Sequence, residues 1–384
     1  MRARRRTTLL TASLVLALGA GPLAAPAVAA PSPSAPVCAG ASSHRSLCEA
    51  IAGLPDENAT AALVRLGGTG GTWQGSSGVR DLASGRPAGP DARFRAGSTT
   101  KVVTAAAVLR LAADGEVDLD ASIERYLPGL LGPGFEAPVT VRNLLNHTSG
   151  IKPGDGWGDT FEEQYAHRYD TLTPRQVVAS AVAKGPAFTA GERQQYLNIN
   201  YTILGMLIEK VTGRPYATEA TRLVLRPAGM HHSYFPGADP RIRGPHHRGY
   251  QAVPRPDGTT RLVDVTEWNQ SDRWAAGDMI STTADLERLV TALFGGRIVP
   301  EPELGEMFTL PAGMDGATYS AGLQRWEQGG TVYWFKSGAR PGYSTMIAAT
   351  ENLSRTLVYS VTDTDAKDAS PNPVIDRIRE AALT

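Results

Sequence analysis

The sequence predicts an α/β protein of the α+β type, in which one antiparallel sheet is built from both ends of the chain and carries flanking helices. Two observations support this prediction. Short apolar and β-branched runs separated by glycine occur between residues 62 and 96, and similar runs return between 319 and 361. The intervening residues instead repeat their apolar side chains at helical spacing. A mainly helical subdomain, at roughly residues 115–315, is therefore expected as an insertion into the sheet domain.

Each element is assigned from its local pattern. The strand patterns cover residues 62–66, 72–79, 92–96, 319–326, 331–336, 344–349 and 355–361. The helical patterns cover residues 101–113, 175–183, 201–211, 216–225, 284–294 and 373–382. No internal repeat interrupts this order, so one large domain or two interleaved subdomains are expected.

The first 29 residues have the features of a signal peptide. Four arginines precede an apolar stretch, Leu9 to Leu18, and Ala27-Val28-Ala29 forms a small-residue cleavage site. A membrane anchor would need about 20 unbroken apolar residues, whereas Gly21 and Pro22 interrupt this stretch. A secreted protein without a membrane anchor after processing is expected. The arginines leave both the general secretory and the twin-arginine routes open.

Charge and cysteine content narrow the possible partners. Removal of residues 1–29 leaves 34 of the 38 basic residues against 38 acidic ones, a formal charge of about −4, so nucleic acid is not an expected partner. Cys38 and Cys48 are the two cysteines, and an oxidising destination favours a disulfide between them, although two free thiols remain the alternative. Residues 30–57 are predicted to be a linker that contains this clip.

Ser98 and Lys101 form the first candidate for catalysis. They lie three residues apart at the start of the helical run 101–113, so they share one helix face and can touch. A serine hydroxyl becomes a nucleophile when a nearby base removes its proton, and a lysine can be that base only when it is neutral. The ordinary lysine pKa of about 10.4 must then fall to about 7, a change worth about 4 kcal/mol.

Two further motifs can join this pair. Tyr196 and Asn198 are two residues apart just before the helical run 201–211, so in an extended segment both side chains face the same cleft. Lys336-Ser337-Gly338-Ala339 closes a strand, where the glycine allows a ligand to approach the backbone and the lysine adds positive charge. Each motif alone is common in turns and strand exits. Their combination in this order is what indicates a site.

The combination resembles the penicillin-recognising serine hydrolases, whose signatures include S-x-x-K and K-T-G. The resemblance is nearest to class C β-lactamases and secreted D-alanyl-D-alanine carboxypeptidases, and it covers roughly residues 58–384. The segments that carry it are FRAGSTTK, LLNHTSGI, YLNINYTILGMLIEKVTG, PAGMHHSYF, WAAGDMISTTADL and the stretch from Tyr319 to Tyr343. The resemblance implies the same sheet-plus-helical-domain fold, with the active site at the boundary between the two parts.

The resemblance also implies a role for each matching residue. Ser98 would be the acylated nucleophile, Lys101 its base or base partner, and Tyr196 the proton shuttle. Asn198 would bind a substrate amide, and Lys336 would supply positive potential for Tyr196 and a substrate carboxylate. The backbone amides of Ser98 and Ala339 would form the oxyanion hole, with Ser337 and Gly338 beside them. Some relatives carry His at the position of Lys336, so this lysine does not select one substrate.

Other chemistry-bearing residues give weaker signals. Arg340, like Arg325, lies near the Lys336 strand and can grip a carboxylate, although an exposed arginine is commonly only solvated. The His231-His232 and His246-His247 pairs lack ligand spacing, so no metal and no cofactor is expected. His147 in NHTSG is interpreted as part of a structural turn. Trp268 and Trp274 can line the cleft or pack in the core.

The expected function is that of an exported serine hydrolase that forms an acyl-enzyme on Ser98 and acts as a monomer. A D-alanyl-D-alanine carboxypeptidase-type peptidase is the main prediction, with a peptidoglycan stem peptide as its substrate. A β-lactamase or an esterase on the same fold, acting on a β-lactam or an ester, is the alternative within the same chemistry. A non-catalytic penicillin- or peptidoglycan-binding module is the alternative from another class of protein.

Overall fold

The computed structural model describes residues 35–40, 44–367 and 370–383, so the expected signal peptide lies outside the described residues. The strands are β1 Val37–Gly40, β2 Ala59–Gly67, β3 Trp73–Gly78, β4 Phe94–Arg95, β5 Tyr250–Pro254, β6 Thr260–Asp264, β7 Ile280–Ser281, β8 Gln324–Gln328, β9 Thr331–Arg340, β10 Tyr343–Ala349 and β11 Thr356–Asp363. The α-helices are α1 Arg45–Ala50, α2 Thr100–Ala113, α3 Val141–Leu145, α4 Phe161–Ala166, α5 Pro174–Ala183, α6 Asn198–Thr212, α7 Tyr216–Ala220, α8 Arg226–Ala228, α9 Thr283–Phe294 and α10 Pro373–Leu383.

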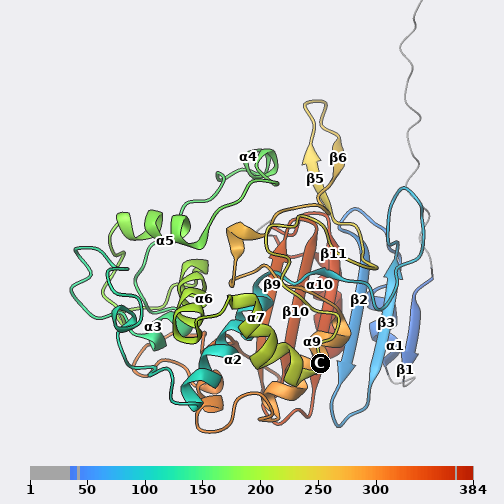
Figure 1. Ribbon diagram of the computed structural model, residues 1–384. Coiled ribbons are helices and arrows are strands. Elements are labelled where there is room, and N and C mark those ends of the chain that lie inside the picture. The colour runs from blue at the N-terminus through green and yellow to red at the C-terminus, as the bar shows by residue number, and fades with distance from the viewer. Residues whose placement is uncertain (1–34, 41–43, 368–369, 384) are drawn as a thin grey trace, which may run out of the picture. The chain divides into compact units, whose positions relative to one another are not determined.

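Seven strands form the main sheet, in the order β1-β3-β2-β11-β10-β9-β8. Every neighbouring pair is antiparallel, and β2 from the first part of the chain pairs with β11 from the last part. The prediction of an antiparallel sheet made from both ends of the chain is therefore confirmed. Helices α2 to α8 come between these two groups of strands in the sequence, and α2, α6 and α7 lie together beside the sheet (Figure 1).

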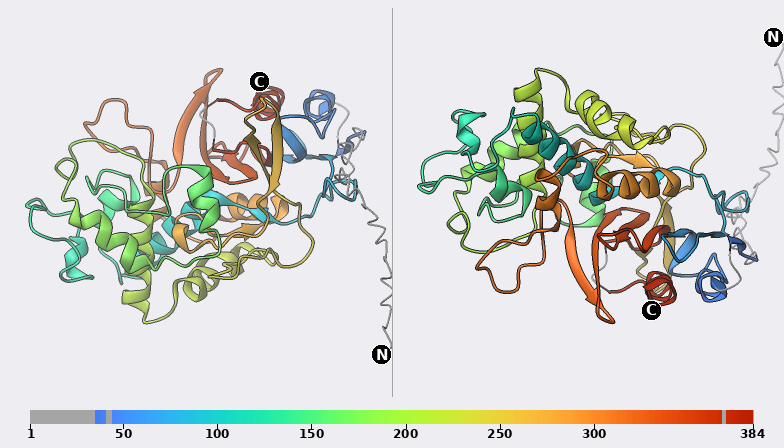
Figure 2. Two further views of the ribbon diagram at one scale, coloured as in Figure 1. Left: turned by 90° about the horizontal axis from the view of Figure 1, so that it is seen from above. Right: turned by 90° about the horizontal axis from the view of Figure 1, so that it is seen from below.

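The two faces of the main sheet bury separate clusters of apolar side chains, because successive residues of a strand point to opposite faces. The inner face, as we call it, carries Leu63, Ile347 and Val358 and packs against the cluster that contains α2 and α9. The outer face carries Val64, Met346 and Leu357 and packs against α1 and α10. Figure 2 shows α1 and α10 on one side of the sheet and α9 on the other.

Helix α2 runs through the interior rather than over the surface. Its sequence is rich in alanine, valine and leucine, and nearly all of its side chains are buried, as expected for a helix that is apolar on every side. It ends shortly before Gly115, whose φ of +76° is a left-handed conformation that glycine adopts without strain. This buried helix holds the residues after Ser98 in a fixed place.

The segment predicted to be a linker, residues 30–57, differs from that prediction. Residues 37–40 form β1 at the edge of the sheet, and the expected disulfide between Cys38 and Cys48 is present. Leu47, Ile51 and Leu54 are fully buried against the outer face. The reason is that α1 is only six residues long, too short for its apolar side to stand out as a helical pattern.

Several other elements depart from their predicted limits, and two of these departures concern the candidate site. The strand expected at 331–336 continues as β9 to Arg340, so Lys336 lies inside it rather than at its end. The helix expected at 201–211 begins earlier, at Asn198. Within the described ranges, none of the helices combines the length and the apolar composition that crossing a bilayer would require.

Candidate active site

Ser98 lies in a tight 3₁₀ turn, Gly97–Thr99, that leads directly into α2. Gly97 has a φ of +53°, and a Cβ atom on it would lie 2.6 Å from the backbone nitrogen of Ala339. A Cβ on Gly338 would likewise lie 2.9 Å from the backbone nitrogen of Ser98. Glycine at both positions therefore lets the serine turn and strand β9 approach each other closely. This contact brings together the two backbone amides that the resemblance assigns to the oxyanion hole.

Lys101 is fully buried and contacts Ser98 directly. Its Nζ donates to Ser98 Oγ at 3.1 Å, to Asn198 Oδ1 at 2.6 Å and to the backbone oxygen of Ala276 at 2.7 Å. Burial lowers the Lys101 pKa to about 8, and the positive charge of Lys336 acts in the same direction. A neutral amine within hydrogen-bond distance of a serine hydroxyl is thus accessible near neutral pH, as the base role requires.

Tyr196 lies between the two lysines. The Nζ atoms of Lys101 and Lys336 are 5.1 Å and 4.7 Å from the centre of its ring. Tyr319 stacks on the ring at 5.0 Å and His147 packs on it at 4.6 Å, so the phenol has little room to move. Within the described residues its buried hydroxyl has no hydrogen-bond partner. The position suits a group that exchanges a proton with a bound substrate.

Lys336 is buried on the inner face of β9, and its Nζ donates to the backbone oxygen of Ser337 at 2.8 Å. Burial lowers the Lys336 pKa to about 7. The lysine therefore carries its full charge only below about pH 7 unless a bound anion raises its pKa again. Ser337 and Ala339 alternate with it along the strand and are less buried.

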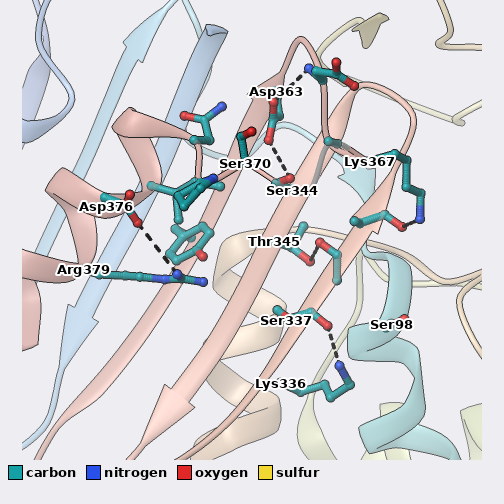
Figure 3. A pocket seen from close by; sticks show the side chains of 18 of the residues that line it. Ser98, Lys336, Ser337, Ser344, Thr345, Asp363, Lys367, Ser370, Asp376 and Arg379 are labelled. Atoms are coloured by element: carbon teal, nitrogen blue, oxygen red, sulfur yellow. Dashed lines mark hydrogen bonds and ion pairs between the residues drawn. The ribbon is translucent and has the colours of Figure 1, made fainter. Parts of the chain in front are cut away.

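A cavity of about 440 Å³ joins these residues (Figure 3). Seven of the predicted site residues line it, namely Ser98, Tyr196, Asn198, Lys336, Ser337, Gly338 and Ala339. Lys101 does not line the cavity and lies behind Ser98, which it contacts. The cavity continues past the end of β9 to residues of β11, of the following loop and of α10. Asn198 is the first residue of α6, and its Oδ1 accepts a hydrogen bond from Lys101 Nζ. Its two side-chain N–H groups can donate to a substrate carbonyl.

Arg340 is the predicted site residue that the structure places elsewhere. Its side chain is buried on the inner face of β9, where its two Nη atoms donate to Asp272 at 3.2 and 3.5 Å, and it does not line the cavity. The alternation of strand residues, if β9 had been predicted as far as residue 340, would have put Arg340 on the buried side with Lys336. Arg325 pairs with Glu327 instead of facing the site.

Many residues of the cavity were not found by sequence reasoning, and two of them lie close to the predicted site. Lys367 follows β11, and its Nζ donates to the backbone oxygen of Ala339 at 3.0 Å. Tyr319 is held by Gln194, whose Oε1 accepts from the Tyr319 backbone nitrogen at 3.0 Å. Neither residue has a local motif, because each reaches the site through contacts between distant segments. Trp268 and Trp274, also considered for the cleft, pack among other aromatic rings.

The described geometry places a serine hydroxyl and a buried lysine one helical turn apart, an arrangement that suits a serine hydrolase. A family model described as beta-lactamase matches residues 47–380, which is most of the chain. The chain belongs to the β-lactamase family.

Individual relatives agree with this assignment. Esterase EstB of Burkholderia gladioli is 35% identical over 189 residues, 46% of this chain and 47% of the esterase. Penicillin-binding protein 4* of Bacillus subtilis is 28% identical over 300 residues, 74% of this chain and 64% of that protein. The chain thus spans about half to two thirds of the length of these curated relatives. A D-stereospecific amidohydrolase from Streptomyces sp. superposes with a TM-score of 0.74 at 31% identity, covering 89% of this chain and 97% of that one.

Proposed function

We propose that the protein hydrolyses amide bonds whose carbonyl belongs to a D-amino acid, in the manner of a D-alanyl-D-alanine carboxypeptidase. The D-stereospecific amidohydrolase among its structural relatives supports an amide substrate and a D-configured residue, and the penicillin-binding protein supports a site that accepts penicillin. The arrangement of Ser98, Lys101 and Tyr196 supports reaction through a covalent acyl-enzyme.

In the first half of the reaction, neutral Lys101 takes the Ser98 proton while Oγ bonds to the substrate carbonyl carbon. The backbone amides of Ser98 and Ala339 stabilise the oxygen that becomes negative, each for about 3 kcal/mol. Tyr196 donates its proton to the departing amine as the C–N bond breaks, and regains a proton from Lys101. In the second half, water attacks the ester, its proton goes to the same Tyr196 and Lys101 pair, and Ser98 leaves with a proton.

The single observation that carries the carboxypeptidase assignment is the positive charge around Ser98. Lys336 and Lys367 both line the cavity, and in the view of Figure 3 Ser98 lies between them. Three acidic side chains also line the cavity, and each has a partner of its own. Asp363 accepts from Ser344 Oγ at 2.8 Å, Asp365 accepts from Gln251 Nε2 at 2.8 Å, and Asp376 lies 3.9 Å from Arg379. A substrate with a free C-terminal carboxylate therefore meets cations next to the nucleophile.

Hydrolysis of three matched peptides tests the proposal. We expect kcat/KM to be highest for a peptide that ends in D-Ala-D-Ala, about ten- to a hundredfold lower for its C-terminal amide, and lower still for the L-Ala-D-Ala diastereomer. Equal rates for the two diastereomers would contradict the D-stereospecificity. Equal rates for the acid and the amide would contradict the carboxypeptidase assignment.

An esterase is the second candidate, favoured by the 35% identity to Esterase EstB. The leaving group of an ester is an alcohol or a phenol, which is less basic than an amine. Hydrolysis of an ester therefore depends less on proton donation by Tyr196 than hydrolysis of an amide does. Turnover of p-nitrophenyl acetate without hydrolysis of any of the three peptides would favour this candidate. Slow release of a bound penicillin, followed by mass spectrometry, would separate a penicillin-binding enzyme from a β-lactamase.

We also propose that the protein works as a monomer outside the cytoplasm, on stem peptides of peptidoglycan. The Cys38–Cys48 disulfide supports an oxidising compartment. Fractionation of the producing cells, together with light scattering of the purified protein, tests the location and the monomeric state. Recovery of the protein in the cytoplasm with both thiols reduced would contradict the location.

A further inference from the structure

We propose that His147 is a positioning residue that fixes Tyr196 in its reactive place by holding the chain on both sides of it. The inference rests on the proposed proton-shuttling role of Tyr196. His147 belongs to the segment NHTSG, between α3 and α4, which the sequence indicated only as a structural turn. It does not line the cavity and is almost completely buried.

Three contacts join His147 to the tyrosine segment. Its backbone oxygen accepts a hydrogen bond from the nitrogen of Gln195, the residue before Tyr196, at 2.8 Å. Its ring atom Nδ1 accepts from the nitrogen of Leu197, the residue after Tyr196, at 3.3 Å. Its ring packs on the ring of Tyr196 at 4.6 Å. His147 thus restrains the residues on both sides of Tyr196 and also the Tyr196 side chain.

The backbone of His147 is strained, which indicates that its place is imposed by its surroundings. Its φ is +63°, a left-handed conformation that only a few per cent of residues other than glycine adopt, most often asparagine, aspartate or histidine. Such a conformation costs about 1–3 kcal/mol and persists where neighbouring contacts determine it. Here it accompanies an arrangement in which the carbonyl and the ring of one residue both reach residues 195–197.

The hydrogen bonds around the ring determine which nitrogen carries the proton. Ser149 Oγ donates to Asn200 Oδ1 at 2.6 Å, which leaves the Asn200 amide nitrogen to face His147 Nδ1 at 3.1 Å. Because Leu197 and Asn200 both donate to Nδ1, the neutral ring carries its proton on Nε2. Burial, and then the charges of Lys101 and Lys336, keep the His147 pKa well below its usual value.

These facts separate His147 from a catalytic base. Its Nδ1 lone pair is already used by two donors, whereas Lys101 contacts Ser98 Oγ directly. A charged imidazolium would lose both hydrogen bonds to Nδ1 and would repel the two lysines. The geometry therefore assigns to His147 the task of holding Tyr196 in place. The transfer of protons is the task of Tyr196 and Lys101.

A series of aryl acetates whose leaving groups differ in basicity tests this assignment. A misplaced proton donor slows the departure of a basic phenol more than that of p-nitrophenol. We expect His147→Gly, which removes the ring and relieves the strain, to lower kcat/KM for the most basic leaving group about a hundredfold and for p-nitrophenyl acetate far less. His147→Asn keeps an acceptor near the place of Nδ1, and asparagine tolerates the left-handed backbone. This variant should therefore lower kcat/KM by no more than about tenfold.

The double variant His147→Gly/Tyr196→Phe supplies the decisive comparison. If His147 acts through Tyr196, the double variant is about as slow as Tyr196→Phe alone. Leu353→Gly is a matched control, because Leu353 has a φ of +57° in the turn between β10 and β11, away from the site. Rates are expressed per active serine by titration with a fluorophosphonate, so that misfolded protein does not count.

Three results would overturn the inference and leave the proposed mechanism intact. In the first, His147→Gly lowers kcat/KM no more for basic leaving groups than for the others. In the second, it lowers kcat/KM as much in the Tyr196→Phe background as in the wild type. Either result would mean that His147 is merely structural. A slow Tyr196→Phe variant together with an unimpaired His147→Gly variant would mean that Tyr196 keeps its reactive place without His147. A Tyr196→Phe variant as fast as the wild type would remove the role of Tyr196 itself, and with it the role of His147.

Discussion

The two faces of the main sheet bury their side chains to a similar degree but with different chemistry. Under α1 and α10, the outer cluster is formed by apolar side chains such as Ile51, Leu357 and Val374. The inner face buries apolar groups as completely, yet Lys101 and Lys336 lie among them with 0% and 4% exposure. The outer face therefore contributes to stability, whereas on the side of the inner face stability and reactivity depend on the same buried side chains.

The physical reason lies in the cost of burying charge. A buried amine loses its hydration, so its neutral form is favoured and its pKa falls. On the inner face this lowers the pKa of Lys101 to about 8 and that of Lys336 to about 7. The same groups in water would remain charged and could not act as a base near neutral pH. Substitutions on the two faces should therefore have different consequences.

The largest expected effect concerns the pair Lys101 and Tyr196, which lie beside the inner face, on α2 and just before α6. Lys101→Ala and Tyr196→Phe should each lower kcat/KM about 10³-fold, because each interrupts one shared path for the proton. The double variant should be little slower than the worse single variant. Steady-state kinetics on one amide substrate measures this. Losses that add in the logarithm of the rate would show that the two residues act independently.

An outer-face substitution should change stability and leave the chemistry intact. Ile51 is fully buried against the outer face, so Ile51→Ala should lower the free energy of unfolding by about 2–5 kcal/mol. Urea unfolding measures this change, and titration of Ser98 gives the rate per folded enzyme. A changed kcat per active serine would break the proposed division between the two faces.

Lys367 should affect the choice of substrate. Lys367→Gln removes a cation from the cavity, so the preference for a peptide acid over its amide should fall about tenfold, and any change common to both substrates cancels in the ratio. Lys184→Gln is the matched control, since Lys184 pairs with Asp155 on the surface. The ratio of the two kcat/KM values is the measurement. An unchanged ratio would assign the preference to Lys336 alone.

The smallest expected effect is a pH dependence of the same preference. Burial lowers the pKa of both Lys336 and Lys367 to about 7, so both lose their charge above that pH, and the preference for the acid over the amide should decline as the pH rises through about 7. Lys101 is active when neutral, so kcat/KM for a neutral ester should instead rise through about pH 8. Profiles between pH 5 and 10 would show both. A preference that increases with pH would contradict the role of Lys336.

The sequence allowed much of the fold to be predicted, because the strong patterns are local. The helical run 101–113 corresponds to α2, Thr100–Ala113, and the four strands near the carboxyl end correspond to β8 to β11. The β5–β6 hairpin was not predicted, since Val263 and Leu262 are part of a largely exposed strand without an alternating pattern. Short and exposed elements depend on tertiary contacts that a local pattern does not contain.

The candidate site was predicted as far as its motifs extend. Ser98, Lys101, Tyr196 and Lys336 lie around one cavity, as their motifs indicated. The partner of Arg340, Asp272, is 68 positions away in the sequence, and Lys367 reaches Ala339 across 28 positions. Such pairings follow from the arrangement of the sheet and the loops that cover it. They could not be deduced from the spacing of residues along the chain.

The central claim is that the buried inner face makes Ser98 a nucleophile, and the most direct test is the identity of the acylated residue. Intact-protein mass spectrometry after a pulse of penicillin or fluorophosphonate, followed by peptide mapping, measures it. We expect one adduct per chain, on the peptide that contains Ser98, and none on the Ser98→Ala variant. A single adduct on any other serine, or an undiminished adduct on Ser98→Ala, would contradict the account.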